Sequence, residues 1–239
     1  MATILKHITF TGVDAKTDIN ALYQIQKEFP IVEWGILVSK NWRENGNRYF
    51  NPSFLPALEH RRLNLSCHLC GSIARSAIRQ DWKPLHNWLC RCGYTSMFNR
   101  CQINVGSEKD NPSCFRYTGD AMDFNEIIIQ QPSANDCGLF LRSIYAPNKN
   151  RVTTLLDASG GKGLESQIEI LNLPHKIGYA GGISADNVGE KLEYLLSHIS
   201  GEFWIDMESG VRTNDWFDID KVYKVLEIYQ SIRKDMVSL

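Results

Sequence analysis

The sequence lacks an excess of charge of either sign, since 26 lysines and arginines face 27 aspartates and glutamates, giving a net charge of −1 over 239 residues. This balance provides no electrostatic basis for binding nucleic acid or an anionic membrane. No apolar run approaches the roughly 18–20 residues needed to span a bilayer. The first residues, MATILKHITFTG, lack the basic leader, apolar core and cleavage site of a signal peptide. We therefore expect a cytoplasmic globular protein with no nucleic-acid or membrane partner.

The cysteines are odd in number, seven in all, and this favours reduced thiols over a disulfide framework. A zinc site is the more specific alternative, because Cys67 and Cys70 are spaced as C-x-x-C and Cys90 and Cys92 follow. However, the first pair ends an apolar strand pattern. The second pair lies in a helix-like stretch, where residues two apart point away from each other. The spacing therefore favours unliganded thiols, and we expect neither a metal ion nor a cofactor.

Short apolar runs alternate with amphipathic stretches along the whole chain. The runs predict eight strands, at residues 8–11, 32–38, 63–68, 101–105, 126–130, 152–156, 177–180 and 203–206. Helices are predicted from residue 18, over 72–99 with an interruption near Lys83, over 163–171, from an N-cap at Ser184 to about 197, and over 218–233. The interval from 105 to 124 is rich in loop-forming residues.

This alternation predicts an α/β protein with a parallel sheet. Eight units in about 240 residues suit a closed (β/α)8 TIM barrel, which typically needs about 250 residues. An open doubly wound sheet would carry a glycine-rich turn after its first strand, and the residues from Thr11 to Asp14 do not form one. No linker is evident, so we expect one barrel domain over residues 1–239.

The ends of the last two predicted strands contain the residues suited to binding an anion. Gly181 and Gly182 follow the seventh strand, and Ser209 and Gly210 follow the eighth. In a barrel a phosphate often sits at these two loops, where glycines permit close backbone approach and a helix N-terminus attracts negative charge. The sequence therefore predicts a phosphate site there.

Three motifs in this half of the chain carry a resemblance to a known family. They are Leu-Leu-Asp157 followed by Gly160-Gly161-Lys162-Gly163, then Ala-Gly181-Gly182 followed by Asp-Asn187, then Asp206 followed by Ser209-Gly210-Val211. In order and spacing they resemble phosphoribosylanthranilate isomerase, the tryptophan-pathway barrel. The residues around Thr11 and the run Asn47-Arg48-Tyr49-Phe50 are similar to that family's first strand and second loop.

The resemblance implies a role for several residues. Asp157 would be the general acid, and Arg48 would bind a substrate carboxylate. Phosphate and substrate would be held by the glycine loops and the floor of the site, namely Gly160, Gly161, Gly181, Gly182, Asp206, Ser209 and Gly210. The family's general base is a cysteine, whose position here is taken by Thr11, and Asn104 stands where the family has a histidine.

A threonine hydroxyl is a very poor base, so removal of the sugar C2 proton requires another group. Asp14 follows the first strand, although it could instead cap the first helix, and His68 ends the third strand. A metal-dependent epimerase is disfavoured, because the second strand lacks the His and Asp partners that such a site needs.

We therefore expect an isomerase-like enzyme that acts on a small phosphorylated sugar-like ligand by acid–base chemistry, as a monomer or homodimer, with candidate catalytic residues Asp157, His68 and Thr11. Two alternatives stay open. One is a non-catalytic barrel that binds such a ligand as a sensor or scaffold. The other is a different sugar-phosphate epimerase or lyase using His68 and Asp157.

Overall fold

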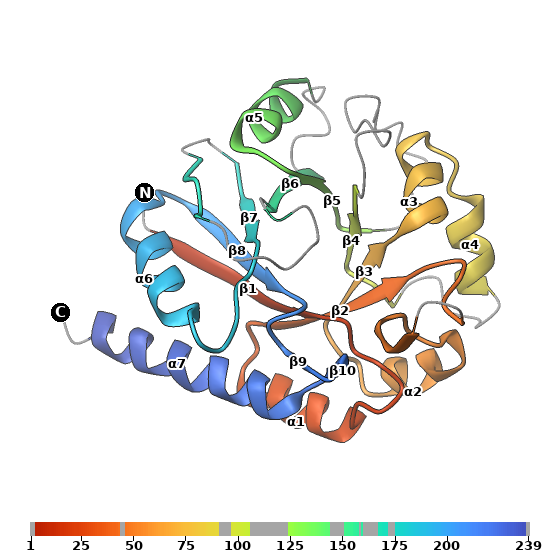
Figure 1. The fold of residues 1–239 in the computed structure, drawn as a ribbon, viewed down its shortest axis with the longest axis horizontal. Helices are drawn as coiled ribbons and strands as arrows, with labels where there is room; N and C mark the ends of the chain where they lie inside the picture. Colours follow the sequence, from red (N-terminus) through yellow and green to blue (C-terminus); the bar gives the residue numbers. More distant parts are fainter. Residues whose placement is uncertain are drawn as a thin grey trace.

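Eight parallel strands close into a barrel in chain order, and helices surround it (Figure 1). The structure is a computed structural model that describes residues 3–43, 46–90, 97–105, 124–143, 151–157, 159, 167–171 and 175–237. The strands are β1 (Ile4–Thr11), β2 (Val32–Val38), β3 (Leu65–Leu69), β4 (Arg100–Ile103), β5 (Glu126–Gln131), β6 (Val152–Asp157), β7 (Ile177–Ala180) and β8 (Glu202–Met207). The predicted (β/α)8 barrel is confirmed, and each of the eight predicted strands is present.

The helices lie outside this ring of strands. They are α1 (Ile19–Glu28), α2 (Leu55–His60), α3 (Gly71–Ile78), α4 (Lys83–Cys90), α5 (Ala134–Ser143), α6 (Val188–His198) and α7 (Ile219–Val237), with short 3-10 turns at Gly46–Arg48 and Pro52–Phe54. A small antiparallel hairpin, β9 (Arg212–Thr213) with β10 (Trp216–Phe217), follows β8. None of the helices in the described ranges is both long enough and apolar enough to cross a membrane.

Strand β2 shows how side chains divide between the core outside the strands and the interior of the barrel. All seven of its residues are buried, and its apolar side chains, Val32, Trp34, Ile36 and Val38, belong to the main core. Gly35 lies between them, where a β-carbon would collide with Thr11 and approach the ring of His68. The outward residues therefore form the core under the helices, and the glycine leaves room for polar side chains inside the barrel.

Two of the predicted helices are wrong in detail. Residues 167–171 of the predicted 163–171 helix are irregular, with Ile168 buried and the Leu171 N–H donating to the Tyr179 hydroxyl; residues 163–166 lie outside the described ranges. Helix α6 begins at Val188 rather than just after Ser184. Ser184 instead pairs with Gly210 in a parallel bridge, and a turn of three residues, 185–187, follows before the helix starts.

Other elements depart from the sequence pattern to a smaller extent. The stretch from 72 to 99 forms two helices, α3 and α4, and residues 91–96 lie outside the described part. Helix α5 and the β9–β10 hairpin were not predicted. The α5 sequence, ANDCGLFLRS, opens with turn-forming residues and contains a glycine, so its helical pattern is weak.

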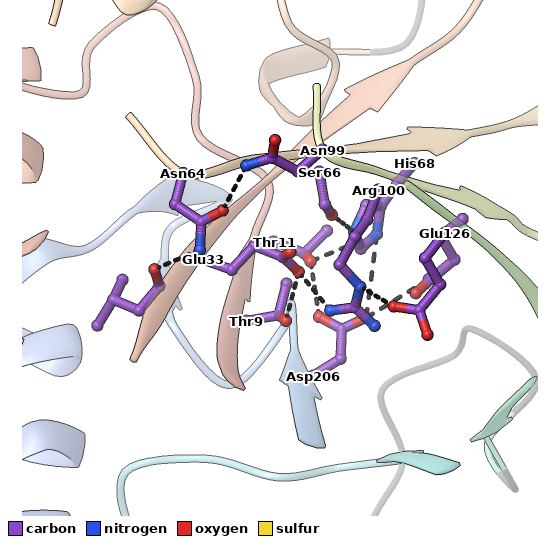
Figure 2. A network of polar contacts seen from close by, with 12 residues as sticks. Thr9, Thr11, Glu33, Asn64, Ser66, His68, Asn99, Arg100, Glu126 and Asp206 are labelled. Atoms are coloured by element: carbon purple, nitrogen blue, oxygen red, sulfur yellow. Dashed lines mark hydrogen bonds and ion pairs between the residues drawn. The ribbon is translucent and has the colours of Figure 1, made fainter. Parts of the chain in front are cut away.

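The lower half of the barrel interior is charged. Arg100 donates to Glu33 at 2.9 Å and to Glu126 at 2.6 Å, and its guanidinium lies 4.4 Å from the ring centre of Trp204 (Figure 2). Lys176 donates to Glu126 at 2.8 Å. Barrel interiors are usually filled by branched apolar side chains. Here a buried ion-pair cluster occupies that space below the carboxyl ends of the strands.

Candidate active site

A cavity of about 400 Å³ opens at the carboxyl ends of the barrel strands. Its walls contain residues from the strands themselves and from the loops that follow them. The lining includes Thr11, Arg48, His68, Gln102, Gln130, Asp157, Gly181, Gly182, Asp206, Glu208, Ser209 and Gly210. The structure therefore brings together, in one hollow, those predicted site residues that lie in the described ranges. Gly160 and Gly161, together with Lys162, lie outside those ranges.

Asp206, on β8, forms part of the floor of the cavity and is buried. Its carboxylate accepts a hydrogen bond from the Thr11 hydroxyl at 2.6 Å and a longer one from the Gln102 amide at 3.4 Å. Burial raises the pKa of Asp206 to about 6, and the negative charge of Asp157 adds to this effect, although the two hydrogen bonds oppose it. This carboxyl therefore changes its protonation state close to neutral pH.

His68, on β3, is buried and lies near Thr11 and Asp206 (Figure 2). Its Nδ1 is 3.5 Å from the Thr11 hydroxyl and 3.9 Å from Asp206 Oδ2, and its Nε2 is 2.5 Å from the Ser66 hydroxyl. Thr11 has one hydroxyl proton, which it donates to Asp206, so its oxygen accepts from His68 Nδ1. Burial lowers the pKa of His68 to about 4, and the imidazole is therefore neutral at pH 7.

Asp157 is at the end of β6 and also lines the cavity. Its Oδ2 accepts from the Gln130 amide at 2.6 Å, and its Oδ1 accepts from the backbone and the hydroxyl of Ser159 at 3.0 and 2.6 Å. These three bonds fix the orientation of the carboxyl group toward the cavity that Asp206 also lines. Two carboxyls in different hydrogen-bonding surroundings are the usual setting for paired acid and base roles.

The two glycine loops after β7 and β8 lie against each other. Ser184 and Gly210 form a parallel bridge, and a β-carbon at Gly210 would overlap the carbonyl oxygen of Ile183. Gly181 and Gly182 have φ values of 107° and 68°, in the region that L side chains rarely adopt. Helix α6 starts directly after the first loop. The predicted phosphate residues thus form one continuous, glycine-lined wall of the cavity.

Arg48, predicted to bind a substrate carboxylate, is paired with carboxylates of the protein. Its Nη1 donates to Glu208 at 3.1 Å and its Nε donates to Asp215 at 2.7 Å. Glu208 lines the cavity, and burial raises its pKa while the Arg48 charge lowers it. The guanidinium still borders the cavity, although two of its donors are engaged.

Asp14, considered from the sequence as a replacement base, does not line the cavity. It is buried and accepts hydrogen bonds from Arg212 at 3.3 Å and from the Phe217 backbone at 2.7 Å. The cap of α1 is Asp18, whose carboxylate accepts from the Asn20 backbone. Asp14 thus fastens the β9–β10 hairpin to the loop after β1.

The cysteine pairs considered for zinc are separated in the fold. Cys67 points to the core and Cys70 borders the cavity, whereas Cys90 is exposed at the end of α4 and Cys92 lies outside the described residues. Within the described ranges no group of three or more His, Cys, Asp or Glu side chains is arranged to hold a metal ion. Burial raises the pKa of Cys70 to about 12, so this thiol stays protonated.

Sequence reasoning missed Gln102, Gln130 and Glu208 as residues of this cavity. A signal was present in the strand pattern, because Gln102 alternates with Cys101 and Ile103, which face the core. Polar residues at alternate positions of a buried strand must point into the barrel. Glu208 follows Asp206 by two positions and shares its face for the same reason.

Comparisons with known proteins agree with this architecture. Residues 120–228, somewhat less than half of the chain, match the family model described as N-(5'phosphoribosyl)anthranilate (PRA) isomerase. The predicted resemblance to phosphoribosylanthranilate isomerase is confirmed over this segment, which contains Asp157, both glycine loops and Asp206. The matched family is one of isomerases. A search of curated protein sequences finds no significant match.

Solved structures with the same fold include two of that name. Phosphoribosyl anthranilate isomerase from Thermococcus kodakaraensis is 15% identical, with a TM-score of 0.57 over 94% of this chain and 99% of that one. The enzyme of that name from Thermus thermophilus is 13% identical, with a TM-score of 0.55 over 95% and 99%. D-Psicose 3-epimerase from Clostridium cellulolyticum is 12% identical, with a TM-score of 0.50 over 96% and 99%. At these identities the likeness concerns the fold.

Proposed function

We propose that this barrel binds a small phosphorylated sugar-like ligand and isomerises it by acid–base chemistry. The observation that carries the proposal is a single cavity lined both by the two glycine loops and by two buried carboxyls, Asp157 and Asp206. The glycine wall offers backbone groups to an anion, and the carboxyls offer proton donors and acceptors to the rest of the ligand. A cavity of about 400 Å³ is large enough for a ligand of this size.

The phosphate is assigned to the wall formed by Gly181, Gly182, Ser209 and Gly210. Backbone there can approach an anion without interference from β-carbons, and the N-terminus of α6 adds a favourable dipole. Such a cradle binds a phosphate group without a cluster of lysines or arginines, which agrees with the neutral charge balance of the chain.

Proton transfer is assigned to the two carboxyls. Asp157 donates a proton to the ring oxygen of the sugar as the ring opens, and Asp206 accepts the C2 proton. The assignment of the base to Asp206 is supported by its pKa of about 6, which leaves it ionised yet appreciably basic at neutral pH. Both ring nitrogens of His68 contact hydroxyls, Ser66 and Thr11, so we assign to it the positioning of Thr11 rather than the base.

Thr11 then acts through Asp206. Its hydroxyl holds Oδ1 at 2.6 Å, and the reacting proton is assigned to Oδ2, which accepts only the longer bond from Gln102 at 3.4 Å. The position that carries the cysteine general base in the isomerases that the chain resembles is thus assigned to support a carboxylate base on the neighbouring strand, since β8 pairs with β1 at Thr9 and Asp206.

The test combines binding with proton exchange. Binding of inorganic phosphate and of ribose 5-phosphate is measured by calorimetry. NMR then follows deuterium incorporation at C2 of ribose 5-phosphate and of its 1-amino derivatives. We expect enzyme-dependent exchange, reduced about 10²-fold or more in Asp206→Asn and in Asp157→Asn. Glu202→Gln, at the opposite end of β8, serves as the matched control and keeps full exchange.

The outcomes separate the alternatives. Binding without exchange by any of these ligands would contradict catalysis and favour a ligand-binding barrel. Loss of exchange in His68→Gln together with full exchange in Asp206→Asn would move the base to His68. Failure to bind phosphate or a phosphorylated sugar would refute the proposed ligand class. Complementation of a strain that lacks phosphoribosylanthranilate isomerase then tests one specific reaction of this class.

A further inference from the structure

The cavity mouth on the β8, β1 and β2 side carries a basic residue that the protein already neutralises. Arg48 is held by Glu208 at 3.1 Å and by Asp215 at 2.7 Å. Glu208 follows β8 and Asp215 lies in the turn between β9 and β10, so two separate segments converge on one guanidinium. Two of the five N–H donors of Arg48 are therefore engaged by carboxylates of the protein, and a ligand carboxylate would have only the remaining three.

The neighbouring basic side chain offers no substitute. Arg212 is buried, and its guanidinium donates to the Gly12 carbonyl at 2.6 Å, to Asp14 at 3.3 Å and to the Asp215 carbonyl at 2.7 Å. It faces the loop after β1 and does not line the cavity. Its role is to hold the turn that presents Asp215 to Arg48.

The cavity lining contains more acidic than basic side chains. Among the described residues the lining contains two cations, Arg48 and the exposed Arg75 of α3, and three carboxyls, Asp157, Asp206 and Glu208. A bound phosphate adds further negative charge at the glycine wall. A second anionic group on the ligand would therefore face carboxylates at short range, in a partly buried site where such repulsion is weakly screened.

We propose that the ligand group accommodated beside Arg48 is a neutral or cationic hydrogen-bond donor, an amine or hydroxyl facing Glu208, and that the ligand carries no carboxylate there. This inference rests on the proposed function and narrows its substrate class to phosphorylated sugars with an amino or hydroxyl substituent. The resemblance to phosphoribosylanthranilate isomerase implies the opposite, a carboxylate on Arg48. In this chain Glu208 and Asp215 already neutralise that guanidinium, and a ligand carboxylate bound there would lie beside both of them.

A matched pair of probes tests the inference. One is 1-anilino-1-deoxyribulose 5-phosphate, and the other is the same compound with an ortho carboxylate on the phenyl ring. Calorimetry with the full chain gives the ratio of their dissociation constants. We expect the probe without the carboxylate to bind about tenfold more tightly or better, because the carboxylate meets Glu208.

Two variants make the charge argument specific. Glu208→Gln keeps the size of the side chain but removes its charge, and it should bring the two dissociation constants within about twofold of each other. Asp215→Asn, at an exposed position outside the lining, should narrow the ratio by a smaller factor. Glu202→Gln, also a glutamate of β8 but at its far end, should leave the ratio unchanged. Thermal unfolding of each variant establishes that it is folded.

The results distinguish this inference from the proposed function. Equal or tighter binding of the carboxylated probe to the unmodified chain would overturn the inference alone, as would an unchanged ratio in a folded Glu208→Gln variant. Failure of inorganic phosphate and both probes to bind would overturn the proposed function, and with it this inference. A preference for the probe without the carboxylate, abolished by Glu208→Gln, supports both.

Discussion

Replacement of Asp206 by asparagine is expected to stabilise the folded protein at neutral pH. The pKa of Asp206 is about 6 against an ordinary value of 3.8, chiefly because burial separates its carboxylate from water. A carboxyl with a raised folded-state pKa opposes folding at pH values above 6, where it is ionised in both states. The penalty disappears below pH 3.8, where both states are protonated. The shift corresponds to about 3 kcal/mol at neutral pH.

The pH dependence of the stability difference between the two proteins identifies ionisation of Asp206 as its cause. From the two pKa values, the penalty grows by about 2 kcal/mol between pH 4.5 and pH 7.5. Asp206→Asn removes this ionisation while keeping an oxygen that accepts the Thr11 hydrogen bond. Urea denaturation of the two proteins at several pH values should therefore show a stability difference that widens by this amount as pH rises.

Two histidines also contribute to the pH dependence of stability, and both are unchanged in the comparison. Burial lowers the pKa of His7 to about 3 and that of His68 to about 4, so their contribution to stability is present at neutral pH and is lost as pH falls. Both histidines are present in the two proteins, and only Asp206 differs. A stability difference that stays constant between pH 4.5 and 7.5 would refute the raised pKa and, with it, the support for a carboxylate base.

Three further substitutions test the packing that supports the cavity. Arg100→Met should lower the free energy of unfolding by about 3–5 kcal/mol in guanidinium denaturation, because of its two carboxylate partners Glu33 stays buried without a counter-charge and Glu126 keeps only Lys176. Replacing those partners by glutamines in the same chain should recover much of the loss; no recovery would contradict the charge argument. Gly178→Ala places a β-carbon inside the volume of the Trp204 ring and should cost about 1–3 kcal/mol in the same assay, whereas a cost near zero would mean that the ring moves freely. Gly210→Ala forces a methyl group against the carbonyl oxygen of Ile183, so calorimetry should show weaker phosphate binding; unchanged binding would place the phosphate elsewhere.

The barrel was predictable because each strand has its own apolar run in the sequence and this pattern recurs eight times along the chain. Predominantly apolar runs such as 32–38 and 177–180 match the strands residue for residue, since a parallel strand buried on both faces needs no alternation. The start of α6 was not predictable from its own sequence. Ser184 is a good cap by residue type, but its backbone pairs with Gly210 from a segment that follows the helix. Only the closed barrel brings these two loops together.

The site residues were partly predictable from their places at strand ends. Asp157 and Asp206 end predicted strands, and the structure places both in one cavity. Their catalytic roles stay predictions. The pairing of Arg48 with Glu208 and Asp215 was not evident, because Arg48 is 160 and 167 positions away from them in the chain. A sequence motif can identify an arginine that could bind an anion. It does not show which carboxylates of the same protein already pair with that arginine.

The hydrogen bond from Thr11 to Asp206 joins the first and last strands, which are 195 positions apart in the chain. The candidate catalytic centre therefore straddles the seam at which the barrel becomes a ring. A nascent or truncated chain that ends before Glu202 has every other strand, Thr11 included, but lacks the proposed base that Thr11 orients. Loop closure over such a separation is the slow, entropically costly part of assembly. Under the proposed function, catalysis therefore requires ring closure, and a substitution that loosens the contact between β1 and β8 is expected to abolish activity before it unfolds the remaining strands.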